Sequence, residues 1–185
     1  HKQVWAGTGE TFLIRPAHAV GNGVYKSSDA GKTWKKMGLD KSFRISRIIV
    51  HPTDTNVVYV GVLGHTHGPQ QEKGVYKTMD SGKTWEKVLF VNENTGVSDM
   101  AIDPKNPNTV YAAMWQVEIK TWNLKSGGPG SGIYRSKDGG KTWTPLRNGL
   151  ESGPSHPVGK TSVDVAYSNP KVLYALVEDK EPRLY

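Results

Sequence analysis

The sequence contains no cysteine among its 185 residues. Disulfide bonds and thiolate metal sites are therefore excluded, and so is a disulfide-rich secreted module. No apolar run approaches the roughly 20 residues that a membrane-spanning helix needs. No stretch keeps apolar residues at helical spacing over three turns, and no signal-peptide pattern is present. The chain has 21 glycines and 11 prolines, which is typical of many short strands joined by turns.

The net charge bears on possible partners. The chain carries 24 basic and 17 acidic residues, which gives +7. That sign would suit an acidic partner such as nucleic acid or an anionic glycan. However, Lys32, Lys83 and Lys141 occupy one recurring position, and no basic run resembles a tail. We therefore interpret the charge as a solvated surface and do not expect nucleic acid as a partner.

Internal repeats organise the chain. One segment occurs over residues 23–34, 74–85 and 132–143, with copies roughly 50 residues apart. Between the copies, an Ile/Val-rich run and then a Val-Tyr-type run recur. Each period thus predicts four short antiparallel strands, which is typical of a β-propeller blade. The competing solenoid interpretation would need shorter units and often a helix.

The repeated segment follows the pattern Ser/Thr-x-Asp-x-Gly-x-Thr-Trp, the Asp box. Its aspartate can accept hydrogen bonds from its own turn, its glycine can adopt φ > 0, and its tryptophan can pack against neighbouring blades. Catalysis needs different groups converging on one point, whereas these copies lie on separate blades, so we expect a structural role. The structural positions are Ser27, Asp29, Gly31, Trp34, Thr78, Asp80, Gly82, Trp85, Ser136, Asp138, Gly140 and Trp143.

The fold predicted from these repeats is an all-β β-propeller fragment of about three and a half four-stranded antiparallel blades. We expect a part blade over 1–35, blades over 36–91 and 92–147, and a part blade over 148–185. An open arc would expose strand edges and blade faces. The missing blades are therefore expected from further chain or from a partner chain.

The box resembles the Asp-box or BNR repeat of sialidases, glycoside hydrolase family 74 xyloglucanases and sortilin-type propellers. Together with Val4–Glu10, Gly23–Lys26 and Asp103–Tyr111, it is most similar to bacterial sortilin-like (Vps10-type) propeller proteins, many of them labelled glycosyl hydrolases. The resemblance implies the architecture more than an activity. A sialidase arginine triad is missing, since Phe43–Ser46 only faintly echoes its Phe-Arg-Ile-Pro motif, and the xyloglucanase catalytic aspartates match no residue here.

Propeller connectivity puts short uniform turns on one face and long variable loops on the other. Variable loops on a rigid scaffold usually carry binding or catalysis. The long loops are 8–22, 62–73 and 114–131, and segments 36–46, 92–98 and 148–160 join the blades. Candidate ligand-binding residues on this face are Glu10, Arg15, His18, Arg44, Arg47, His65, His67, Trp115, Glu118 and Trp122.

Each of these candidates also has a simpler interpretation. Trp115 and Trp122 could stack on a sugar or cover a peptide, but they could equally anchor their loop on the blade. His65 and His67 could bind a metal, yet no third ligand is identifiable and a simple loop is favoured. Glu10 and Glu118 could form an acid/base pair, but nothing in the sequence sets their separation. We assign no catalytic residue, metal or cofactor.

The sequence favours a non-catalytic binding or scaffold propeller of an exported sortilin-like protein. It would bind protein, peptide or glycan through the loop-rich face. The alternative is a xyloglucanase-like glycoside hydrolase whose catalytic carboxylates lie partly in the missing blades. A bacterial, extracytoplasmic location, whether periplasmic, cell-surface or secreted, is expected on the same grounds.

Overall fold

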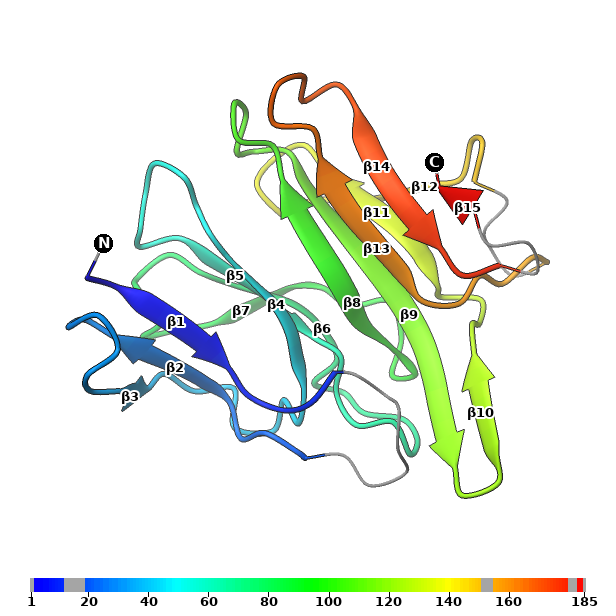
Figure 1. The fold of residues 1–185 in the computed structure, drawn as a ribbon, viewed down its shortest axis with the longest axis horizontal. Coiled ribbons are helices and arrows are strands. Elements are labelled where there is room, and N and C mark those ends of the chain that lie inside the picture. The colour runs from blue at the N-terminus through cyan, green and yellow to red at the C-terminus, as the bar shows by residue number, and fades with distance from the viewer. Residues whose placement is uncertain (1, 12–18, 151–154, 180–182, 185) are drawn as a thin grey trace.

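In the computed structural model, the protein is described over residues 2–11, 19–150, 155–179 and 183–184. These residues form strands and no helix, as the repeats predict. The strands make four antiparallel sheets that follow one another along the chain (Figure 1). The predicted propeller-type architecture is confirmed.

The sheets have the following strands. Sheet one contains β1 (Val4–Gly7), β2 (Val24–Ser27) and β3 (Lys35–Lys36). Sheet two contains β4 (Ile45–Val50), β5 (Val58–Val62), β6 (Gly74–Thr78) and β7 (Glu86–Leu89). Sheet three contains β8 (Thr95–Ile102), β9 (Val110–Lys120), β10 (Asn123–Ser126), β11 (Gly132–Ser136) and β12 (Thr144–Leu146). Sheet four contains β13 (Thr161–Val165), β14 (Leu173–Val177) and β15 (Arg183–Leu184).

Sheet two shows the complete blade pattern, with strands paired in the order β4-β5-β6-β7. Its Val-Tyr-Val run is the second strand and is buried at every position, because neighbouring sheets cover both faces. Sheet three repeats the order as β8-β9-β11-β12 and adds a strand that the sequence did not predict. That strand, β10, lies in the expected loop 114–131 and pairs with an extended β9.

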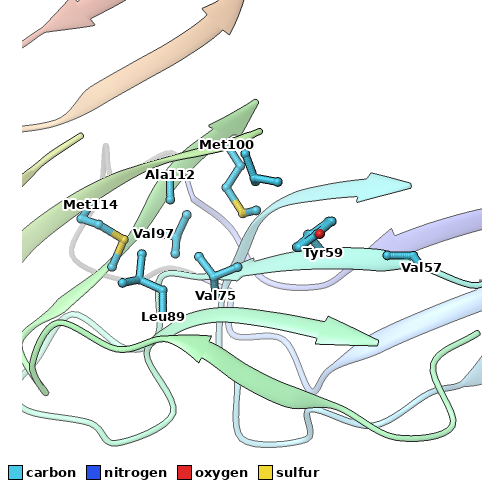
Figure 2. Packing of buried hydrophobic residues seen from close by; sticks show 9 residues of the cluster. Val57, Tyr59, Val75, Leu89, Val97, Met100, Ala112 and Met114 are labelled. Carbon is cyan, nitrogen blue, oxygen red and sulfur yellow. The ribbon is translucent and has the colours of Figure 1, made fainter. Parts of the chain in front are cut away.

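The hydrophobic core lies between sheets. Valines and alanines from the second strands meet residues of the next sheet's first strand, and three such clusters separate the four sheets. Figure 2 shows the cluster between sheets two and three, where Tyr59 and Val75 approach Val97 and Met100. Because each sheet buries its faces against the next, stability comes from blade-to-blade packing.

The three Asp boxes form the turns β2–β3, β6–β7 and β11–β12. In the first, Asp29 accepts hydrogen bonds from the Thr33 backbone N–H at 2.8 Å and the Thr33 hydroxyl at 2.6 Å. The Ser27 hydroxyl donates to Asp29 at 2.7 Å and accepts from the Gly31 N–H at 2.8 Å. The other two boxes repeat this network. The box glycines have φ of 91°, 85° and 94°, where a side chain would be strained.

The box tryptophans differ in their surroundings. Trp85 donates its indole N–H to the Met37 carbonyl oxygen of sheet one at 2.7 Å and meets the Trp5 ring edge to face. Trp143 packs against the core between sheets two and three. Trp34 is 44% exposed, so among the described residues it lacks the inter-blade burial expected of a box tryptophan.

The first strands β4, β8 and β13 lie next to one another. Asp99 of β8 accepts a hydrogen bond from the Val163 N–H of β13 at 3.2 Å and pairs with the Arg47 guanidinium of β4 at 3.6 Å. The Ser98 hydroxyl donates to the Thr161 carbonyl oxygen at 2.6 Å. The pairing register shifts just before both residues, between Ile45 and Arg47 in β4 and between Val97 and Asp99 in β8.

Sheets one and four are the ends of this arrangement. Tyr174, Leu176 and Leu184 of sheet four are more than half exposed. In the part of the chain that the structure describes, no helix is long and apolar enough to cross a membrane.

Candidate functional site

The loop-rich face is built mainly from the 63–73 loop of sheet two and the β9–β10 hairpin of sheet three. The two are joined edge to edge, since the Ile119 N–H donates to the Thr66 carbonyl oxygen at 2.8 Å. His67 Nδ1 lies 2.8 Å from the Ile119 carbonyl oxygen. The loop of the preceding blade therefore holds the hairpin close to its tip, since Ile119 pairs with Leu124 just before the turn. The hairpin itself extends beyond the rest of its sheet (Figure 1).

Two buried cations hold the surrounding loops. Arg44 is 2% exposed and donates to the carbonyl oxygens of Glu10 at 3.1 Å and Gly64 at 3.4 Å. Lys73 is 1% exposed and donates to the carbonyl oxygens of Gly68 and Asn94, both at 3.3 Å. Burial lowers the pKa of both groups, that of Lys73 to about 8. Arg44, a predicted ligand contact, is thus engaged in fixing loops.

The two histidines of the 63–73 loop have different surroundings. Burial is the largest cause of the lowered pKa of His65, and Lys73, His67 and Arg44 lower it further. Its Nδ1 is buried without a hydrogen-bond partner, and its ring meets Phe43 edge to face at 5.5 Å. Among the described residues, no group of three His, Cys, Asp or Glu side chains is placed to hold a metal ion. The structure brings His65 and His67 near the buried Arg44, with His65 partly buried and His67 exposed.

The two candidate tryptophans have opposite surroundings. Trp115 is 4% exposed and donates its indole N–H to the Ser126 hydroxyl at 2.9 Å, so it anchors the hairpin base. Trp122, at the hairpin tip, is 84% exposed. It is the candidate that can offer a whole indole face to a ligand.

The candidate carboxylates come from different sheets. Glu118 is on β9 beside Lys120, with 3.3 Å between the ammonium nitrogen and the carboxylate oxygen. It also lines a small cleft of about 100 Å³ with Gln116 and Lys125. Glu10 follows β1, and its carbonyl oxygen accepts the hydrogen bond from Arg44. Arg47 pairs with Asp99 on the first strands, while Arg15 and His18 lie outside the described residues.

Sequence reasoning missed a second polar cleft, of about 260 Å³, beside the hairpin base. Glu178, Asp179 and His156 line it, and the sequence holds no motif that links these three. The available signal was only that Glu178 and Asp179 directly follow a predicted strand and His156 lies in a blade-joining segment.

The chain is similar to known propeller proteins. A family model described as Sortilin, neurotensin receptor 3 matches residues 22–180. A xyloglucanase of Paenibacillus sp is 30% identical over 79% of this chain and 16% of its own length. An ancestral GH74 enzyme of known structure is 25% identical, with a TM-score of 0.66 over 86% of this chain and 19% of that one. The GH74 xyloglucanase from Xanthomonas campestris is 17% identical, with a TM-score of 0.65 over 95% of this chain and 25% of that one, which shows the fold alone.

Proposed function

This chain belongs to the Sortilin-Vps10 family, and from that premise we propose that it is part of a xyloglucanase-like glycoside hydrolase that binds a β-glucan on its loop-rich face. The likeness to xyloglucanases over most of the chain supports hydrolysis over a purely non-catalytic scaffold, which the sequence alone favoured. The chain spans only 16% of that relative's length, so the proposal concerns the whole protein.

The observation that carries the glycan proposal is the indole of Trp122. It is 84% exposed on a hairpin whose base is fixed by Trp115 and whose β9 strand is held near the tip by the 63–73 loop. A rigidly mounted, solvent-exposed indole offers a flat apolar face to the C–H face of a sugar ring at little entropic cost. We assign no catalytic carboxylate to this chain.

The test uses the full-length protein and xyloglucan, with release of reducing ends and oligosaccharide binding as readouts. Trp122→Ala is expected to weaken binding about three- to tenfold, and Trp122→Phe to retain most of it. Met79→Ala, exposed on an Asp-box turn, is the matched control. No hydrolysis of xyloglucan or any other β-glucan by the full-length protein would overturn the proposal.

A second candidate is a binding propeller for protein or peptide ligands. The observation in its favour is the family model itself, whose description is that of a receptor. Absence of hydrolysis together with peptide binding that depends on the loop-rich face would favour this candidate.

Further blades are the partners we propose for the two ends. Tyr174 and Leu176 of sheet four are exposed, whereas the corresponding second strand of sheet two is wholly buried by its neighbours. At the other end, β1 pairs with β2 alone, and a cleft of about 580 Å³ separates its Trp5 from Val50 of β4. Blades from further chain or from a partner chain would cover both surfaces.

An extracytoplasmic location follows from this proposal, because a polysaccharide is too large to enter the cytoplasm before hydrolysis. Recovery of the full-length protein in the soluble cytoplasmic fraction of its source cell would contradict it.

A further inference from the structure

A polar cleft lies between the base of the β9–β10 hairpin and the loops that flank sheet four. We call it the Glu178 cleft; its volume is about 260 Å³. Residues from three separate parts of the chain line it, namely Ser126, Ser155, His156, Pro157, Gly159, Glu178 and Asp179. Convergence of polar groups from distant segments distinguishes a binding site from a solvated turn.

A chain of hydrogen bonds orients the Glu178 carboxylate. The Trp115 indole N–H donates to the Ser126 hydroxyl at 2.9 Å, and that hydroxyl donates to Glu178 Oε2 at 2.8 Å. The Lys160 backbone N–H donates to the same oxygen at 2.7 Å. Oε2 is thus engaged twice, whereas Oε1 accepts no hydrogen bond from a described residue. A carboxylate held by one oxygen presents the other as a fixed acceptor.

Gly159 leaves the space that this arrangement needs. A Cβ at position 159 would lie 2.4 Å from Glu178 Oε2 and 2.8 Å from the Ser126 hydroxyl oxygen. Backbone hydrogen bonds fix the glycine opposite Glu178, because its N–H donates to the Glu178 carbonyl oxygen at 2.8 Å. The close approach of hairpin and sheet four therefore depends on the missing side chain.

The cleft also holds a second polar pair. His156 Nε2 lies 3.0 Å from Asp179 Oδ1, and the imidazole is about one-third exposed. When one ring nitrogen binds Asp179, the other can donate to or accept from a ligand hydroxyl. The cleft therefore offers a fixed carboxylate oxygen and an oriented imidazole.

We propose that the Glu178 cleft binds one pyranose unit of a neutral glycan. Carboxylate acceptors and an imidazole suit the hydroxyl groups of a sugar, whereas an anionic group would meet two carboxylates here. The volume lies just below the range for drug-sized ligands, which fits a single ring. This inference rests on the proposed glycan-binding function and adds a second contact region to Trp122.

The cleft is tested in the full-length protein with a xyloglucan oligosaccharide as the probe. Glu178→Gln is expected to weaken binding about tenfold or more, since it removes a charged acceptor from a hydrogen bond to the ligand. His156→Phe removes the imidazole and is expected to weaken binding several-fold. Glu86→Gln, on the exposed outer strand β7, is the control and should bind as the wild type does.

Hydrogen exchange of the unaltered protein gives a readout that needs no variant. The oligosaccharide is expected to protect backbone amides of residues 155–161. The oligosaccharide could bind without protecting these amides, and with the same affinity in Glu178→Gln. That result would overturn the proposal that the cleft binds sugar, while the proposed function would stand. If the full-length protein binds and hydrolyses no glycan, the proposed function fails and the cleft proposal fails with it.

Discussion

The Tyr59 hydroxyl of sheet two donates a hydrogen bond to the Gly139 carbonyl oxygen, in the Asp-box turn of sheet three, at 2.9 Å. The Lys77 ammonium donates to the same oxygen at 2.8 Å. One blade earlier, the Trp5 ring packs against Gly82 of the next box so closely that a Cβ there would lie 2.8 Å from it. In both cases an aromatic residue on the second strand of one blade contacts the Asp-box turn of the following blade. The Asp box therefore helps to hold neighbouring blades together.

Tyr59→Phe tests this contact. Tyr59 is 1% exposed, so loss of its hydroxyl removes a buried hydrogen bond while the ring stays in place. We expect the free energy of unfolding to fall by about 0.5–1.5 kcal/mol, measured by urea denaturation. Tyr167→Phe, at a side chain that is 79% exposed, should have no measurable effect. Equal stability of the two variants would show that the hydrogen bond from Tyr59 to Gly139 does not stabilise the packing of the two blades.

Acid stability should depend on the Asp-box carboxylates. The pKa of each box aspartate, Asp29, Asp80 and Asp138, is lowered from 3.8 to about 2. The largest cause in each case is the hydrogen bonding from the threonine four residues later in the same box. A lowered folded pKa stabilises the protein above pH 3.8, and that stability is lost as the pH falls through about 2.

Asp80→Asn should therefore lower the thermal midpoint at pH 6 and flatten its decline between pH 4 and 2. Asp40→Asn, at a mostly exposed side chain, serves as the control and should keep the wild-type decline. A decline in Asp80→Asn as steep as that of the wild type would show that the box carboxylate does not set acid stability.

Asp99 links the first strands of three successive blades. Asp99→Ala leaves the Val163 N–H without its acceptor and the Arg47 guanidinium without its pair. We expect a loss of about 1–3 kcal/mol in the free energy of unfolding, because an unsatisfied buried donor costs its desolvation. Glu86→Ala is a control without such contacts. An undiminished stability of Asp99→Ala would mean that the contacts of Asp99 do not help to join the blades.

The repeats predicted the architecture because strand pattern and turn chemistry are local properties of the sequence. Asp29 with Gly31 and Thr33 is such a case, since all partners lie within a few residues. The β10 strand was missed because Asn123, Lys125 and Ser126 have little β propensity of their own. It forms because an extended β9 offers a free edge for pairing.

The candidate site was predictable only in part. Trp115 and Trp122 lie in the same expected loop, yet Trp115 is buried in a cluster with Leu63, Val117 and Ile119 while Trp122 is exposed to solvent. Glu178 belongs to the candidate cleft because its carboxylate accepts a hydrogen bond from Ser126, which is 52 residues away in the chain. Contacts at such separation depend on how blades pack, and no local pattern reports them. For Arg44 the sequence predicted a ligand contact that the structure does not favour. The side chain is buried and donates to backbone carbonyl oxygens instead.

Lys73 predicts a pH dependence of the same sign as that of the Asp boxes, but in an alkaline window. Burial lowers its pKa from 10.5 to about 8. Between pH 8 and about 10 the unfolded chain holds this proton while the folded protein has released it, so stability rises with pH through that window. Above pH 10 the buried Tyr59 and the partly buried Tyr76, whose pKa values burial raises to about 12, act in the opposite direction.

Lys73→Met keeps much of the apolar stem and removes the titrating group. We expect the variant to lack the gain of about 1–3 kcal/mol that the wild type shows between pH 8 and 10 in urea denaturation. Lys137→Met, at an exposed lysine, should retain that gain. If Lys73→Met shows the same rise as the wild type, then Lys73 stays protonated across this window in the folded protein, and its ammonium remains bound to the Gly68 and Asn94 carbonyl oxygens at pH 10.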